Sequence, residues 1–144
     1  MTQQIPKEWE EVTAQVSKIG EELRNDAYSA KFAPEAEYKK SLNVLTGCYM
    51  YLIVQFKRYR AIKENNEVAK FCELKNAAED PLVAKTLKFT SAAAEKEASA
   101  SVSEERYLRD YLEGWTCACE QGIYTIKKHL EADRKEGDIS KFEN

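Results

Sequence analysis

Four basic side chains fall within seven consecutive residues of this chain, and one aromatic ring, Tyr59, lies among them. The four are Lys57, Arg58, Arg60 and Lys63, here called the basic cluster. Cations at this spacing can bind the phosphates of a nucleic-acid strand while an aromatic ring stacks on a base. On a helix, Lys57 and Arg60 lie about 60° apart and share one face. The sequence therefore predicts a phosphate-binding cluster, although the same arginines could instead pair with acidic side chains of a neighbouring helix.

Other residues that could take part in catalysis or bind metal do not form a recognisable site. The single histidine, His129, is accompanied by no serine or cysteine motif, and there is no glycine-rich phosphate loop. Cys117 and Cys119 are two residues apart, so on a helix their side chains diverge by about 200° and cannot bind one zinc ion. We therefore predict a non-enzymatic protein with no catalytic residue, no metal site and no cofactor.

The composition is that of a charge-rich helical protein. The chain has 144 residues, the size of one domain, with 33% charged residues, five glycines and three prolines. Its net charge of −3 comes from residues 1–30, which hold three Lys or Arg and six Asp or Glu, so the rest of the chain is neutral overall. This balance argues against a general polyanion binder and leaves room for a local basic patch.

The cysteines and the apolar stretches favour a reducing compartment. The four cysteines are Cys48, Cys72, Cys117 and Cys119. Three lie in apolar helical surroundings and no secretory signal precedes them, so we expect free thiols. The most apolar stretch, residues 42–54, is too short to span a bilayer and is interrupted by Asn43 and Thr46. We expect a cytoplasmic protein, in a host cell if the source is a virus, without membrane contact.

All three prolines stand where a helix can begin, since a missing N–H costs nothing in the first turn. The predicted elements are helices over about 7–31, 35–78 and 81–136, and a frayed tail over 137–144. The second and third helices would be roughly 65 and 80 Å long, which is too long for a sphere. The sequence thus predicts an all-α fold, an elongated antiparallel hairpin of two long helices with a shorter N-terminal helix, forming one domain over residues 1–144.

A heptad made mostly of apolar or small residues runs through the third predicted helix. Its members are Leu87, Ser91, Ala94, Ala98, Ser101, Glu105, Leu108, Leu112, Trp115, Cys119, Gly122 and Ile126. Within residues 90–103, the positions on and around the seam are nearly all small, which predicts a close approach to a second helix, with a solvated alanine-rich helix as the alternative. Met50, Ile53 and Val54 lie outside the seam of the second helix, and three helices cannot cover all such surface. We therefore predict a homo-oligomer.

The segment YLEGWTCACEQGIYTIKKHLEADRKEG, residues 111–137, resembles the C-terminal segment of the UvsY-like recombination mediators of tailed phages. The family pattern places a glycine before a large apolar residue, then Ile-Lys, another apolar residue, an arginine and a glycine. The corresponding positions here are Gly122, Ile123, Ile126, Lys127, Leu130, Arg134 and Gly137.

The resemblance implies a small helical, ring-forming protein that binds single-stranded DNA. Such a protein helps to load a recombinase in place of a single-strand-binding protein, so both are implied partners. Carried over, the basic cluster would contact phosphates, and the C-terminal helix would drive assembly. The implied interface residues are Leu108, Leu112, Trp115, Ile123 and Ile126.

Two functions therefore stand as expectations. The first is an accessory single-stranded DNA-binding protein of the recombination-mediator type. The second is a helical oligomer that scaffolds an assembly or inhibits a partner through protein contacts alone. Exposure of the basic cluster distinguishes them, because only the first function needs those cations to face solvent.

Overall fold

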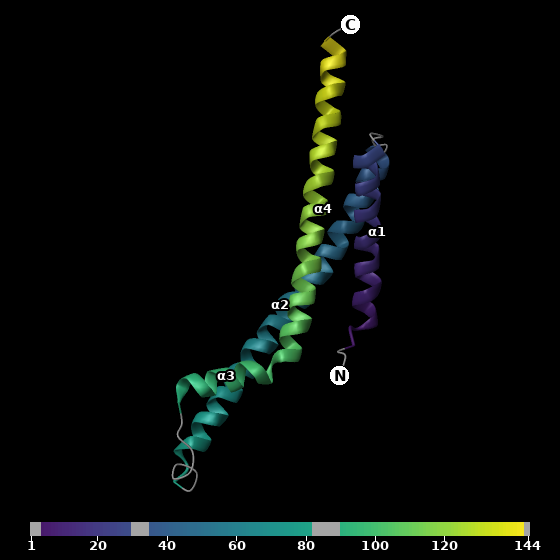
Figure 1. Cartoon of the computed structure of the whole chain (residues 1–144). Coiled ribbons are helices and arrows are strands. Elements are labelled where there is room, and N and C mark those ends of the chain that lie inside the picture. The colour runs from purple at the N-terminus through teal and green to yellow at the C-terminus, as the bar shows by residue number, and fades with distance from the viewer. Residues whose placement is uncertain (1–3, 30–34, 82–89, 143–144) are drawn as a thin grey trace. The chain divides into compact units, whose positions relative to one another are not determined.

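A computed structural model describes residues 4–29, 35–81 and 90–142, and the regular structure within these ranges is entirely α-helical. The helices are α1 (Lys7–Ser29), α2 (Glu35–Glu79), α3 (Ser91–Ser101) and α4 (Ser103–Phe142), shown in Figure 1. This confirms the all-α class with two long helices and a shorter N-terminal helix. The first two helices begin where the sequence predicts, and α2 ends one residue later than expected.

The third predicted helix is wrong in two respects. In place of one helix to residue 136, the chain forms α3 and α4, separated at Val102, whose φ of −108° and ψ of 25° are not helical. The tail expected to fray continues as helix to Phe142. The sequence predicts that the helix begins at residue 81, but residues 82–89 lie outside the described residues, so this start stays a prediction. Within the described residues, α3 begins at Ser91, with Thr90 as its N-cap. The Thr90 side chain accepts a hydrogen bond from the Ala93 N–H at 3.3 Å, which satisfies a first-turn donor.

The chain divides into two compact units, which we describe separately. The α1 unit consists of residues 4–54 and 113–144, and thus of α1, the first half of α2 and most of α4. The α3 unit consists chiefly of residues 55–112, and thus of the second half of α2, α3 and the beginning of α4. In each unit, helices pack side by side through apolar faces, as the three-and-four spacing of the sequence predicts.

The core of the α1 unit is built from one face of each of its three helices. Its buried side chains are Trp9, Thr13, Val16, Ile19, Tyr38, Leu45, Cys48, Leu52, Thr116, Cys119 and Ile126. Here α2 and α4 run antiparallel: the Tyr38 ring stacks on His129 with centroids 5.4 Å apart, and the Tyr49 hydroxyl donates to Glu120 Oε1 at 3.1 Å. The antiparallel pairing expected of the hairpin is therefore present in this unit.

The core of the α3 unit is made largely of small residues. Ala94, Ala98 and Val102 are 5%, 1% and 1% exposed, and Figure 1 shows α3 lying along the second half of α2. The small side chains of α3 therefore pack against protein, as predicted, and the alternative of a solvated alanine-rich helix is wrong. Where α3 ends, Arg106 Nη2 donates to the carbonyl oxygen of Ser99 at 3.0 Å, so an α4 side chain satisfies a C-terminal carbonyl of α3.

Candidate nucleic-acid interface

The basic cluster lies on α2 within the α3 unit, and its members differ in their surroundings. Lys57, Arg58 and Arg60 are exposed, whereas Lys63 is half-buried. All four are more than one turn from either end of α2, so the helix fixes their angular positions. The structure thus presents three of the four predicted cations to solvent within one turn of helix.

Two of the four cations have acidic partners one turn along the same helix. Arg60 Nε lies 3.2 Å from Glu64 Oε1, with both side chains more than half exposed. Lys63 Nζ lies 2.5 Å from Glu67 Oε2, and this lysine side chain is only 15% exposed. An exposed pair of this kind contributes about 0.3–0.5 kcal/mol and opens easily, while a lysine held against the protein is much less available. Lys63 therefore contributes little to a phosphate site.

Lys57 and Arg58 form no ion pair with any described residue. Of the two arginines, Arg60 has its acidic partner, Glu64, within α2 itself. Tyr59 is half-buried, so part of its ring is covered by protein. A base could stack only on the part of the ring that remains accessible.

The five predicted interface residues occupy two kinds of position. Leu112 and Ile126 are both 0% exposed and belong to the core of the chain itself. Leu108, Trp115 and Ile123 are half-buried. A side chain that is enclosed by its own chain cannot bury the same surface against a second copy, so the prediction that Leu112 and Ile126 join two copies is wrong.

Other apolar residues are more exposed than the predicted interface. Met50 and Val54, on α2 in the α1 unit, are 64% and 62% exposed. They lie four residues apart and so occupy the same side of the helix. The sequence already indicated surplus apolar surface at these positions, and the structure leaves it uncovered within the chain.

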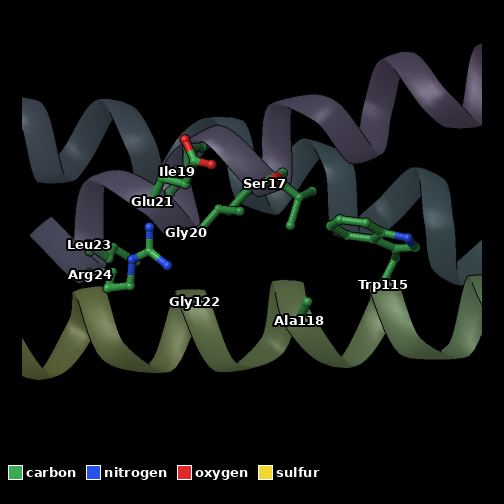
Figure 2. A pocket seen from close by; sticks show the side chains of 11 residues that line it. Ser17, Ile19, Gly20, Glu21, Leu23, Arg24, Trp115, Ala118 and Gly122 are labelled. Carbon is green, nitrogen blue, oxygen red and sulfur yellow. The ribbon is translucent and has the colours of Figure 1, made fainter.

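A cavity between α1 and α4 in the α1 unit was not foreseen from the sequence. It measures about 370 Å³, and its lining includes four small residues, Ser17 and Gly20 of α1 with Ala118 and Gly122 of α4, beside larger side chains. Figure 2 shows Trp115 at one end of this cavity and Gly122 on the side of α4 that faces α1. A possible signal was Gly20 in the first helix, where a Cβ atom would have no other atom within 4 Å, so the missing side chain leaves space open.

Gly122 also marks a close approach between α2 and α4. A Cβ atom at this position would lie 2.9 Å from Leu45 Cδ1, and Leu45 is itself only 1% exposed. By contrast, a Cβ at Gly114, also in α4, would have no atom within 4 Å. The seam glycine at 122 is thus explained by packing.

The perturbed titrating groups reflect local packing rather than a reaction centre. Burial raises the pKa of the Cys119 thiol to about 11 and also raises the pKa of Cys48. The hydrogen bond to Glu120 raises the pKa of the Tyr49 hydroxyl. A catalytic acid or base needs a pKa near the working pH and a reacting group within reach. None of these three groups fits that description.

Within the described ranges, no three His, Cys, Asp or Glu side chains are placed to hold one metal ion. None of the helices in these ranges is both long and apolar enough to cross a membrane. No protein family matches the chain, and comparisons with curated proteins and with solved structures return no match.

Proposed function

We propose that this protein is a non-enzymatic accessory protein that binds single-stranded DNA through phosphate contacts from Lys57, Arg58 and Arg60. The observation that supports it is the exposure of all three cations, two of which form no ion pair within the described part of the chain. Lys63 is left out of the proposed site because it is held against Glu67.

Three cations per chain make a weak site, because each phosphate contact contributes little by itself. With counterion release, log affinity falls against log salt with a slope of about −0.7 per contact, or roughly −2 for one chain. Useful affinity therefore requires several copies along one strand, in line with a homo-oligomer and with avidity. The resemblance of residues 111–137 to the UvsY-like mediators adds a role in loading a recombinase, with that recombinase or a single-strand-binding protein as partner.

A salt titration of oligonucleotide binding tests this proposal. A fluorescent single-stranded oligonucleotide is titrated with the protein at several salt concentrations from about 50 mM upward. The double variant Lys57→Ala/Arg58→Ala should bind every sequence more weakly and flatten the slope by about 1.4 per chain, since it removes two phosphate contacts. Circular dichroism should be unchanged, because both side chains are exposed and unpaired with described residues.

The matched control is Lys75→Ala/Lys96→Ala, which removes the same charge from exposed positions elsewhere in the α3 unit. This control should retain the wild-type slope if binding is local to the basic cluster. Equal losses in both double variants would indicate a diffuse charge effect and contradict the assigned site. Wild type that fails to bind at about 50 mM salt would contradict the function itself.

The exposure of Met50 and Val54 favours a second function, that of a helical scaffold or inhibitor acting through protein contacts. If this surface joins copies of the chain, Met50→Glu/Val54→Glu should lower the mass in light scattering without loss of helical signal, because the introduced charges would have to be buried. The control is Val68→Glu, at an equally exposed apolar residue of the α3 unit. A wild-type protein that is already monomeric would contradict self-assembly.

A further inference from the structure

Two contacts fix the register of α2 against α4 in the α1 unit. The ring of Tyr38 stacks on His129, and the Leu45 side chain packs against the backbone of Gly122, which has no side chain there. Moving seven residues forward along α2 thus moves the contact seven residues back along α4, as an antiparallel pair requires.

A further step of three residues in the same direction leads to two cysteines. It runs from Leu45 to Cys48 on α2 and from Gly122 to Cys119 on α4. Three residues are nearly one helical turn, so each cysteine stays on the side that faces the other helix. Both are buried, at 6% and 0% exposure. The register therefore places the two thiols opposite each other in the core.

The electrostatic interaction between the two thiols agrees with this placement. Besides burial, the negative charge of Cys48 contributes to the raised pKa of Cys119, an effect that requires the two groups to be near each other. Cys48 Sγ has only weak polar neighbours, the carbonyl oxygen of Val12 at 4.0 Å and Gln15 Oε1 at 3.9 Å. The Cys48 thiol is therefore not committed to a strong hydrogen bond that oxidation would break.

We propose that Cys48 and Cys119 form a thiol pair that a small-molecule disulfide, such as oxidised glutathione, converts to an intramolecular disulfide joining α2 to α4. One thiolate attacks glutathione disulfide, gives a mixed disulfide and releases one glutathione thiolate. The second protein thiolate then attacks the protein sulfur of the mixed disulfide and releases the other glutathione. The protein loses two protons and two electrons, and one glutathione disulfide becomes two thiols.

The position of the pair determines both the effect and the rate of the reaction. A bond between residues 48 and 119 closes a loop of about 70 residues, which restricts the unfolded chain strongly and should raise the unfolding temperature by on the order of 10 °C. The reaction should be slow near neutral pH, because burial keeps the thiols protonated and covered. Its rate should rise with pH, because only the thiolate form attacks a disulfide.

The experiment uses the full-length chain with Cys72→Ser/Cys117→Ser, which removes the two exposed thiols and leaves the pair. The protein is equilibrated in glutathione buffers of increasing oxidised fraction, with urea just below the unfolding midpoint so that the buried thiols become reachable while the native state still predominates. Samples are quenched in acid, unfolded and treated with maleimide. We expect a monomer whose mass is lower by two hydrogens and whose cysteines no longer react with maleimide. After trypsin digestion, peptides 41–57 and 110–127 should be found joined by the disulfide. The rise in unfolding temperature should reverse on reduction.

The same background with Cys48→Ala is the control, and oxidation should leave its unfolding temperature unchanged. Two maleimide-reactive thiols in the most oxidising buffer would overturn the proposal. It would also be overturned by glutathione remaining on both cysteines, or by disulfides that form only between chains. A linked protein that is no more stable than the reduced one would show that the native helices do not accommodate the bond, and would overturn it equally.

Discussion

Replacing Leu112 by glutamate is expected to unfold the chain rather than to dissociate an oligomer. Leu112 is 0% exposed within a single chain, so the introduced carboxylate would be enclosed by the protein itself. Loss of a buried leucine costs about 2–5 kcal/mol, and an unpaired buried charge adds about 3 kcal/mol or more. The sum is comparable to the whole free energy of unfolding of a typical domain, about 5–15 kcal/mol.

Urea unfolding followed by circular dichroism measures this effect, and the pH adds a second signature. Burial raises the pKa of the introduced carboxyl above its unfolded value of about 4.3, so the folded variant binds the proton more tightly. The variant should therefore be least destabilised below about pH 4.3 and should lose stability as the pH rises. Tyr107→Glu serves as control, because Tyr107 is 49% exposed and its replacement should cost less than about 1 kcal/mol. A helical Leu112→Glu protein of reduced mass would contradict our description of the core.

Leu112 and Ile126 show what heptad spacing can and cannot establish. The spacing correctly marked both as positions that need a helical partner. It carries no information on whether that partner lies in the same chain or in another, because the pattern of a seam is the same in both cases. Burial within one chain answers the question for these two residues, whereas the exposed Met50 and Val54 keep the question of assembly open to experiment.

The break at Val102 shows a limit of reading a long helix from periodicity. The alternating steps of four and three predicted burial of Ser101, yet Ser101 is exposed and Val102 is 1% exposed. The buried positions instead advance by four residues twice, from Ala94 to Ala98 and from Ala98 to Val102. Each step of four turns about 40° further than one full turn, so the buried positions shift by about 80° around the helix axis. Ending the helix at Val102 allows the chain to bury an apolar side chain in place of a polar one.

The pairing within the basic cluster could have been recognised in the sequence. Arg60 and Glu64, like Lys63 and Glu67, stand four residues apart, which is the spacing of neighbouring side chains on a helix. The exposure of each pair could not be foreseen in this way, since it depends on which face of α2 is covered. That difference matters for function, because the Arg60 side chain is 61% exposed and the Lys63 side chain only 15%.

Gly114 and Gly122, two glycines of α4 in the α1 unit, are expected to respond to alanine with opposite signs. In an exposed helix interior, alanine is more stable than glycine by about 0.5–1 kcal/mol, because glycine loses more backbone entropy on folding. Gly114 has free space for a Cβ, so Gly114→Ala should raise the free energy of unfolding by about that amount. At Gly122 the same methyl would meet Leu45 Cδ1 at 2.9 Å, and overpacking of this kind costs about 1–3 kcal/mol. Gly122→Ala should therefore be destabilising by about 1 kcal/mol on balance.

A double-mutant cycle with Leu45 identifies the cause of that loss. Leu45→Ala removes the Cδ1 atom that the new methyl would meet, so in this background Gly122→Ala should become stabilising, as it is at position 114. The interaction free energy from urea unfolding of the four proteins should then be about 1–3 kcal/mol, the range found for residues in direct contact. The matching cycle between Leu45→Ala and Gly114→Ala should give less than about 0.5 kcal/mol, because no Leu45 atom lies within 4 Å of that position.

If Gly122→Ala stabilises the wild-type chain as much as Gly114→Ala does, Leu45 must move readily into the neighbouring cavity. In that case α2 and α4 would not be held closely at this layer, and the facing arrangement of Cys48 and Cys119 one turn away would lose its firmest support.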